Sequence, residues 1–506
     1  MSDPQQPKKR RFDKDISKFD AAARGVAETP FGIANWMYGL LFLVLVLFFA
    51  TFQAGDGEGR IFIIIAGVIG GYMALNIGAN DVANNVGPAV GSRALTMFGA
   101  LIIAAVFETA GAILAGGDVV STISKGIIDP ALIDDSRTFI LAMMAALLAA
   151  AIWINLATKI GAPVSTTHSI VGGVLGGGIA AVGFEAVNWP VMGKIAASWV
   201  ISPVLGGLIG AIFLAFIKST IIYREDKIEA AKRWLPVLVA IMAAAFSAYL
   251  SVKGLKRIWR PDASTVAFVS CSAFALGYFL VKPAIARQAI GLENRNKEVA
   301  KLFVIPLICA AALLSFAHGA NDVANAVGPL AAIVSATSTG DIGGKVEIPF
   351  WVMLVGALGI SAGLALFGPK LIRTVGEQIT KLNPMRAYCV ALSAAITVII
   401  ASGLGLPVSS THIAVGAIFG VGFFREFDSA RRRKKRRIAG FEAENKANGK
   451  PPPTATEAQL KVAKIQHRRL VRRRHAMTIA AAWLITVPLA ALLSALVYFI
   501  LKLIIG

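Results

Sequence analysis

Long apolar runs without charge alternate with short polar segments along most of the chain. Runs of 18 or more residues without Asp, Glu, Lys or Arg cover 36–53, 61–80, 138–158, 195–217, 235–252, 263–281, 348–369 and 476–501. A helix needs about 20 residues to cross roughly 30 Å of hydrocarbon at about 1.5 Å per residue. The pattern therefore predicts an all-α polytopic membrane protein. It excludes a soluble enzyme, a nucleic-acid-binding module and a disordered scaffold.

Composition agrees, since 56% of the 506 residues are apolar, only 16% are charged, and the mean hydropathy is +0.69. The net charge is +21, and nearly half of the basic residues lie in two segments, because residues 1–24 and 425–474 hold 24 of the 50 Lys and Arg residues. Both segments adjoin membrane runs. Their charge predicts a cytoplasmic N-terminus in a bacterial inner membrane, with anionic lipid headgroups rather than nucleic acid as the partner of the basic loop. Cys271, Cys309 and Cys389 fall in apolar segments and are predicted to pack there.

Two polar motifs occur twice, in the same order. Residues 78–88 read GANDVANNVGP and residues 319–329 read GANDVANAVGP, identical at ten of eleven positions. PVSTTH at 163–168 recurs as PVSSTH at 407–412. The two offsets, 241 and 244 residues, are nearly equal. Such duplication indicates an internal structural repeat, as in transporters whose site forms at the repeat interface.

Counting membrane crossings from an inside N-terminus makes the second copy run opposite to the first. We therefore expect inverted-topology repeats with discontinuous helices and two helical hairpins, 138–183 and 387–424. One external loop, with Lys253, Lys256, Arg257 and Arg260, violates the charge rule. The predicted units are a basic cytoplasmic arm 1–35, an extra membrane helix and external loop 36–59, a first repeat 60–217, connecting spans 218–301, a second repeat 302–424, a basic cytoplasmic loop 425–475 and a final membrane helix 476–506.

The repeated Asn-Asp motif lies at membrane depth, where a charge costs a few kcal/mol or more. Irregular backbone survives there only if it lines a cavity or is buried in protein. We therefore expect a discontinuous helix whose carboxylate and amide oxygens face a small cation or an oxyanion. The residues are Asn80, Asp81, Asn84, Asn321, Asp322 and Asn325. The alternative is that these side chains only join neighbouring helices.

Each hairpin tip reads as a stop, a proline and three hydroxyl residues at the start of a new helix. Ser and Thr cap free N–H groups, and a helix N-terminus attracts anions. Two such tips entering from opposite faces would meet around one tetrahedral oxyanion. The residues are Ser165, Thr166, Thr167, Ser409, Ser410 and Thr411. Ordinary capping of buried helices is the alternative.

Four titratable residues are candidates for proton transfer or gating. His168 and His412 close the tips, and His318 precedes the second Asn-Asp motif, where the first copy has Ile77. Glu108 is isolated in an uncharged run, and Ile360 stands at its place in the second half. Each of the four has a purely structural alternative, a hydrogen bond that fixes its surroundings.

With these motifs, and with FETAGAIL around Glu108, the chain resembles the inorganic phosphate transporter (PiT) family of ion-coupled symporters. The resemblance covers roughly residues 60–424 and the last span. It implies inverted repeats with two hairpins, a homodimer, and phosphate uptake driven by sodium or protons, without a further cofactor. Phosphate would be held by the six tip residues with Asn80, Asp81, Asn321 and Asp322. The implied cation ligands are Asp81, Asn84, Asp322 and Asn325.

Two features depart from that family: the segment 1–59, and Ala391, where some members have a glutamate. We therefore predict a secondary active transporter that imports inorganic phosphate by alternating access. The alternatives are a sulfate or related oxyanion symporter, an anion channel, and a membrane-embedded enzyme acting on phosphate esters. The sequence has no HExxH, GxSxG, phosphate-loop lysine or CxxC motif, which argues against an enzyme.

Overall fold

The computed structural model describes residues 32–57, 59–133, 135–162, 164–254, 261–340, 342, 346, 348–378, 382–448 and 473–505. Within these ranges it contains helices and one isolated β-bridge, Ile128–Val187. Eleven of the described segments are long and apolar enough to cross a membrane. This confirms the predicted all-α, multi-span fold. Most of the basic arm 1–35 and of the loop after residue 448 lies outside the described residues.

The first half of the chain forms α2 (Ile33–Gln53), α3 (Arg60–Gly91), α4 (Met97–Ala115), α5 (Gly117–Ser121), η1 (Thr122–Gly126), η2 (Pro130–Leu132), α6 (Ser136–Lys159), α7 (Thr166–Val182), η3 (Phe184–Ala186), α8 (Trp189–Ile217) and η4 (Lys218–Ile222). Next come α9 (Lys227–Tyr249), η5 (Leu250–Gly254), α10 (Ala263–Gln288), α11 (Asn296–Val299) and η6 (Ala300–Phe303). The second half forms α12 (Val304–Asp322), α13 (Ala324–Thr339), α14 (Phe350–Gln378), α15 (Pro384–Gly403), α16 (Ser410–Ala447) and α18 (Arg473–Ile505).

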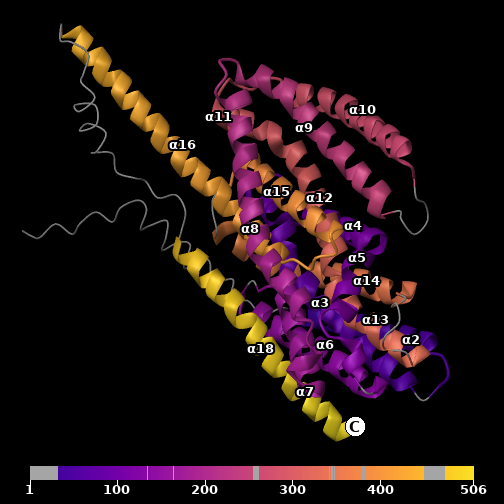
Figure 1. The fold of residues 1–506 in the computed structure, drawn as a ribbon. Coiled ribbons are helices and arrows are strands. Elements are labelled where there is room, and N and C mark those ends of the chain that lie inside the picture. The colour runs from indigo at the N-terminus through magenta and orange to yellow at the C-terminus, as the bar shows by residue number, and fades with distance from the viewer. Residues whose placement is uncertain are drawn as a thin grey trace, which may run out of the picture.

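The two repeats exchange packing partners. Helix α3 of the first repeat packs along α14 of the second, and α12 of the second packs along α4 of the first. Hairpin 1 (α6 and α7) packs on α18, whereas hairpin 2 (α15 and α16) packs on α8. Figure 1 shows α18 lying beside α6 and α7. The two halves therefore form one intertwined body and not two adjoining domains.

Glycines at matching positions allow this close packing. A Cβ at Gly176 of α7 would lie 2.0 Å from the carbonyl oxygen of Ala491 in α18. A Cβ at Gly420 of α16 would lie 2.0 Å from the carbonyl oxygen of Gly207 in α8. No side chain fits at such a distance. The second arm of each hairpin therefore contacts its partner helix backbone to backbone.

The sequence places a helix break in each Asn-Asp motif, and the structure has one only in the second copy. Helix α3 continues through the first motif, including Pro88, to Gly91. Helices α12 and α13 are separated by Val323 alone. The motif glycine serves helix contact instead, because a Cβ at Gly78 would lie 1.9 Å from the Ile360 carbonyl oxygen. At the matching Gly319, a Cβ would lie 2.1 Å from the Glu108 carbonyl oxygen.

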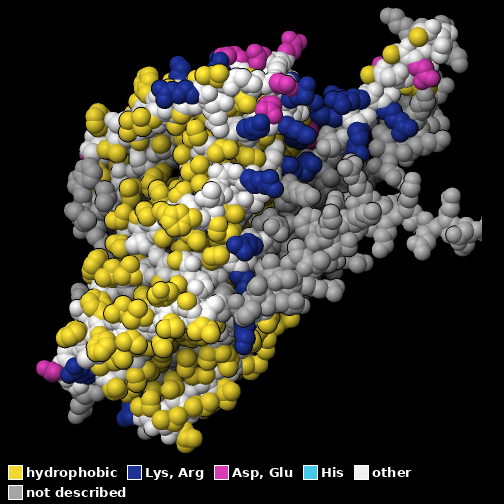
Figure 2. Space-filling view, turned by 180° about the vertical axis from the view of Figure 1, so that it is seen from behind, with side chains coloured by type: hydrophobic (Ala, Val, Ile, Leu, Met, Phe, Trp, Pro, Cys, Tyr) yellow, Lys and Arg dark blue, Asp and Glu magenta, His cyan; other side chains and the backbone are white. Residues whose placement is uncertain are grey.

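The basic segment after residue 424 begins as helix, where a loop was expected. Helix α16 continues to Ala447 and extends away from the bundle (Figure 1). Arg, Lys, Ala and Glu dominate this stretch and are strong helix formers. The view from behind shows apolar side chains over much of the surface, with Lys and Arg gathered at the end beside this extension (Figure 2). The extension is tied to η4, which follows α8 directly, by an ion pair, since Lys218 Nζ lies 2.8 Å from Asp428 Oδ2.

Candidate functional site

Both hairpin tips are built by the same local chemistry. Gly161 and Gly405 take left-handed backbone conformations, with φ of +74° and +69°, and so end α6 and α15. Ser165 then caps α7 by accepting from the His168 backbone N–H at 3.1 Å. Ser409 accepts from the His412 backbone N–H at 3.3 Å. Ordinary capping therefore uses one acceptor of each of these serines, and their predicted phosphate contact remains a prediction.

The two tips meet each other inside the bundle. Thr167 Oγ1 donates to the Val408 carbonyl oxygen at 2.9 Å. The His168 and His412 rings lie edge to face with centroids 4.3 Å apart. Trp199 of α8 covers this pair, with its ring centroid 3.8 Å from that of His168. The tips are thus brought together at a buried point, as the duplicated PVS motifs predicted.

The first Asn of each motif braces the tip of the hairpin from its own repeat. The Asn80 side-chain oxygen accepts from Thr158 Oγ1 at 2.9 Å, and Asn321 Nδ2 donates to Ser402 Oγ at 2.9 Å. Asn321 Oδ1 also accepts from the Val408 backbone N–H at 3.3 Å. These amides are engaged in positioning the tips, so the structure gives them a bracing role. Their predicted contact with substrate is untested.

The second Asn of each motif reaches the tip of the other repeat. Asn84 Nδ2 donates to Thr411 Oγ1 at 2.8 Å. Asn325 Nδ2 donates to Thr167 Oγ1 at 3.2 Å. Each Asn-Asp motif therefore contacts both hairpins. A movement of either hairpin tip would change the contacts of both motifs.

The two aspartates lie against the hydroxyl residues. Asp81 accepts from Thr166 Oγ1 at 2.7 Å and from Thr411 Oγ1 at 3.2 Å. Asp322 accepts from Ser410 Oγ at 3.1 Å. Residues from both repeats therefore surround one small volume. All the site residues predicted from the sequence are buried, and none of them is more than 6% exposed.

A second group of titratable side chains adjoins the aspartates. His318 Nε2 lies 2.9 Å from Asp322 Oδ2 and 3.8 Å from Asp81 Oδ2. His318 Nδ1 lies 3.4 Å from Glu108 Oε1, which also accepts from Asn85 Nδ2 at 2.7 Å. Three buried carboxylates thus converge on one imidazole.

The donor set suits a cation. One ligand atom each from Asp81, His318 and Asp322 lies within 4.8 Å of the others. Asn85 Oδ1, Glu108 Oε2, Asp322 Oδ1 and Asn325 Oδ1 are buried acceptors without a hydrogen-bond donor among the described residues. Buried oxygens of this kind are costly unless they are paired, and hard cations prefer them. The residues therefore fit a small cation better than a soft metal.

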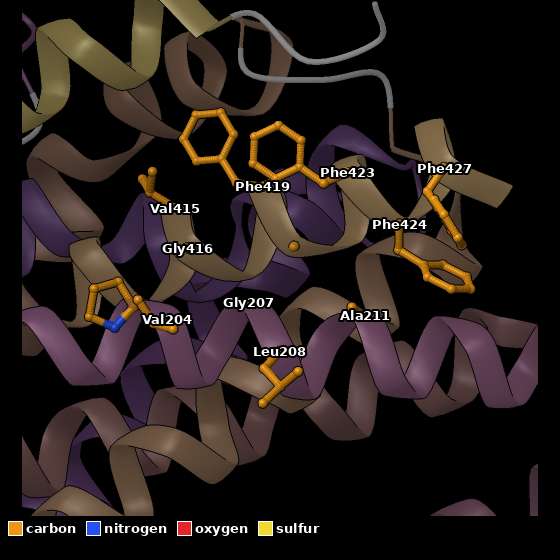
Figure 3. Close-up of a pocket in the computed structure, with 12 residues that line it drawn as sticks. Val204, Gly207, Leu208, Ala211, Val415, Gly416, Phe419, Phe423, Phe424 and Phe427 are labelled. Atoms are coloured by element: carbon orange, nitrogen blue, oxygen red, sulfur yellow. The ribbon is translucent and has the colours of Figure 1, made fainter. Parts of the chain in front are cut away.

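An apolar cavity of about 710 Å³ lies elsewhere, between α8 and α16. Figure 3 shows Val204, Leu208, Phe419 and Phe423 around it. Its lining carries no charged side chain, so it offers nothing to a multiply charged anion. The site of interest is the polar junction of the tips.

Several contributors were not predicted from the sequence. Asn85 is the single motif position at which the copies differ, with Ala326 opposite, and this mismatch was a usable signal. The sequence contains no signal for the roles of Thr158 and Ser402, since hydroxyl residues are common in apolar helices. Lys253 was noted only as a charge on the wrong side. It forms an ion pair with Asp118 at 3.0 Å, which explains how a lysine is accommodated there.

Comparison with known proteins agrees with this architecture. The model of a family described as the phosphate transporter family matches residues 77–494. The chain belongs to the phosphate transporter family. This is a family of transporters and not a class of enzymes, and the chain is accordingly a multi-pass membrane protein.

Individual relatives extend the match. The chain is 48% identical over 523 aligned positions to a Helicobacter pylori J99 protein named "Putative phosphate permease", covering 96% of this chain and 98% of that protein. A Pyrococcus abyssi protein of the same description is 35% identical, covering 86% and 96%. A solved structure described as the sodium-dependent phosphate transporter is 37% identical with a TM-score of 0.74, covering 88% of this chain and all of that chain.

Proposed function

We propose that this chain imports inorganic phosphate together with a coupling cation, sodium or a proton, by alternating access. The observation that carries the proposal is the convergence of two hydroxyl-bearing helix N-termini on Asp81 and Asp322. Hydroxyl and backbone N–H groups at a helix N-terminus bind a tetrahedral anion without formal positive charge. We assign phosphate contact to the tip hydroxyls, above all Thr166, Ser410 and Thr411.

Charge balance supports coupling to a cation. Asp81, Glu108 and Asp322 are fully buried around His318, so the junction is already rich in negative charge. An incoming phosphate adds more, and buried charge of one sign is strongly unfavourable. A cation held by Asp81, Asn84, Asp322 and Asn325 would offset that cost. Sodium is tested first, because a relative of known structure is described as sodium-dependent.

Alternating access is supported by the exchange of packing partners. Each hairpin lies on a separate helix, α18 or α8, while the tips share one junction. One hairpin can therefore withdraw while the other keeps its packing. Sulfate remains the alternative substrate, since both anions are tetrahedral.

We also propose the cytoplasmic side of the bacterial inner membrane for the N-terminus and the basic extension of α16, near anionic headgroups. A homodimer is proposed as well. Helix α10 contacts mainly α9 and has only Ile285 buried, so a lipid layer or a second copy must cover it. Chemical crosslinking in native membranes tests the dimer.

Uptake of labelled phosphate into proteoliposomes tests the function. A sodium gradient and a proton gradient are imposed separately, with sulfate as competitor. Gradient-driven accumulation that sulfate does not inhibit supports the proposal. Asp81→Asn and Asp322→Asn should abolish the cation dependence, whereas Thr109→Val, which loses a hydroxyl contact to Ser361 away from the tips, should retain it. Phosphate-dependent current without coupling to any cation would identify a channel instead.

A further inference from the structure

The tip of hairpin 2 is fastened by groups outside the binding junction. Lys253 Nζ, in η5, donates to the Gly403 carbonyl oxygen at 2.8 Å and pairs with Asp118 Oδ2 at 3.0 Å. Thr122 Oγ1 of η1 donates to the Gly405 carbonyl oxygen at 2.7 Å. Both acceptors lie where α15 ends, so two neighbouring elements hold the carbonyl groups at the last turn of that helix.

The tip of hairpin 1 differs at the matching positions, 244 residues earlier. Lys159 corresponds to Gly403, and Gly161 corresponds to Gly405. A Cβ at Gly161 would meet nothing within 4 Å, whereas one at Gly405 would lie 3.4 Å from the Asp118 carbonyl oxygen. Ile160 and its counterpart Leu404 are equally exposed, at 70% and 69%, so the difference lies in the bonds and not in the exposure. Among the described residues, no side chain of a neighbouring element donates to the carbonyl oxygen of Lys159 or Gly161, as Lys253 and Thr122 do to those of Gly403 and Gly405.

A cavity of about 160 Å³ lies beside hairpin 1, lined by residues of α2, α3, α6 and α14. Thr158 and Lys159 of α6 border it, together with Asn76 of α3. Thr158 is also the residue that Asn80 binds from within the junction. The cavity thus reaches the back of the binding site on the hairpin 1 side.

We propose that Lys253 and Asp118 form a latch that holds hairpin 2 closed while hairpin 1 faces the open side. This inference rests on the proposed alternating access and names the residues that keep one face shut. The ammonium group of Lys253 is placed at the C-terminal end of α15, where a cation is favoured by the helix dipole. Both side chains of the pair are 32% exposed. A pair of this exposure is weak enough to open during each cycle.

The latch explains the exception to the charge rule. Lys253 lies on the predicted external side, where a lysine is unusual. Its two partners, Asp118 and the Gly403 carbonyl, supply the reason for a positive charge at that place. The opposite face has no matching bond at the hairpin 1 tip in the described residues.

Distance measurements between spin labels test the latch. One label replaces the exposed Ser121 and the other replaces Leu404, which is 69% exposed, in a background without Cys271, Cys309 and Cys389. We expect one short distance in the parent. Lys253→Met and Asp118→Asn should each add a longer component, with about a fivefold rise in the open population. The exchanged pair, Lys253→Asp with Asp118→Lys, should keep the longer component, because a carboxylate at position 253 cannot donate to the Gly403 carbonyl oxygen.

Lys232→Met is the matched control, because this lysine pairs with Glu229 on the exposed surface of α9, the helix that leads into η5. It should change neither the distance nor uptake. An unchanged distance in both latch variants, with phosphate binding retained, would overturn the latch alone. Failure of the parent protein to bind phosphate at all would instead overturn the proposed function, whatever the labels report.

Discussion

Asn85 donates a 2.7 Å hydrogen bond to Glu108, and each residue stands where the two repeats differ. The second copy has Ala326 and Ile360 at the corresponding places. Helix contacts support the second match, because Gly78 abuts the Ile360 backbone as Gly319 abuts that of Glu108. The two polar residues that are peculiar to the first repeat are therefore paired with each other.

His318 is the third such difference, with Ile77 in the other copy, and its Nδ1 lies 3.4 Å from Glu108 Oε1. These three departures from symmetry thus gather in one polar cluster. We infer that both tips offer equivalent hydroxyl contacts to the anion. The cluster of Asn85, Glu108 and His318, in contrast, has no equivalent at the symmetry-related place.

This cluster should behave as a unit. Glu108→Ile or His318→Ile alone leaves a buried charged partner unmatched, a change that costs about 3–5 kcal/mol in soluble proteins. The double variant restores the apolar pair found in the opposite repeat and should lose much less than the sum. Thermal unfolding in detergent, analysed as a double-mutant cycle, measures the coupling. Strictly additive losses would contradict a direct interaction.

Glycine substitutions should separate packing from motif identity. Gly78→Ala places a Cβ 1.9 Å from the Ile360 carbonyl oxygen, a backbone atom that cannot rotate away. We expect a large loss of folded protein and of uptake. Gly87→Ala is the control within the same motif and helix, because nothing lies within 4 Å of its Cβ. Alanine is favoured over glycine in a helix by about 1 kcal/mol, so this variant should be at least as stable as the parent. Equal damage from both would refute the packing explanation.

Thr411 links both motif side chains to the second tip. Its hydroxyl donates to Asp81 at 3.2 Å and accepts from Asn84 at 2.8 Å. Thr411→Val leaves both groups without that partner, at about 1–3 kcal/mol, which corresponds to roughly a 5- to 150-fold weaker phosphate affinity. Calorimetric titration of phosphate into the purified protein measures the change. Thr109→Val, away from the tips, should bind normally, and an unaffected Thr411→Val would remove this residue from the site.

The α16 extension should detach in acid. Burial disfavours the charged form of Asp428, but the hydrogen bonds from Lys218 and Tyr223 and the nearby charges of Lys218 and Arg432 outweigh it and lower its pKa below the ordinary 3.8. Stability from this carboxylate is therefore present above about pH 4 and is lost as pH falls through the lowered value. Asp428→Asn should show the detached state at neutral pH.

Tryptic cleavage within Arg431–Arg437 reports this detachment. We expect faster cleavage in Asp428→Asn than in the parent at pH 8. Glu442→Gln, an exposed change on the same helix, serves as the control and should cleave at the parental rate. Identical rates in all three proteins would show that Asp428 does not anchor the extension.

The spans, the duplication and the meeting of the tips could be predicted because each depends on a local rule. A long uncharged run predicts a membrane helix. A glycine followed closely by a proline and by Ser and Thr residues predicts the end of one helix and the capped start of the next. The exchange of packing partners could not be predicted in this way. It depends on contacts between residues far apart in the sequence, such as Gly176 with Ala491 and Gly420 with Gly207. Helix continuity through Pro88 was missed for a similar reason, because packing against α14 outweighs the local breaker.

The bracing role of Asn80 and Asn321 was also beyond the sequence. Their partners, Thr158 and Ser402, are ordinary hydroxyl residues in apolar helices. Composition cannot distinguish an amide that binds substrate from one that binds a neighbouring hydroxyl. Only the folded positions of α6 and α15 decide between the two, and substrate binding by these amides remains to be measured.

The packing of hairpin 1 on α18 has a consequence for biogenesis. Residues 136–182 leave the ribosome long before residues 473–505, yet the backbone contact of Gly176 requires the last helix. Newly made hairpin 1 must therefore wait in the lipid bilayer, with its glycine face uncovered, until translation is nearly complete. Substitutions or truncations near the C-terminus would then destabilise the first repeat, which is made earliest. Quality-control proteases would recognise such proteins by their incompletely packed first repeat.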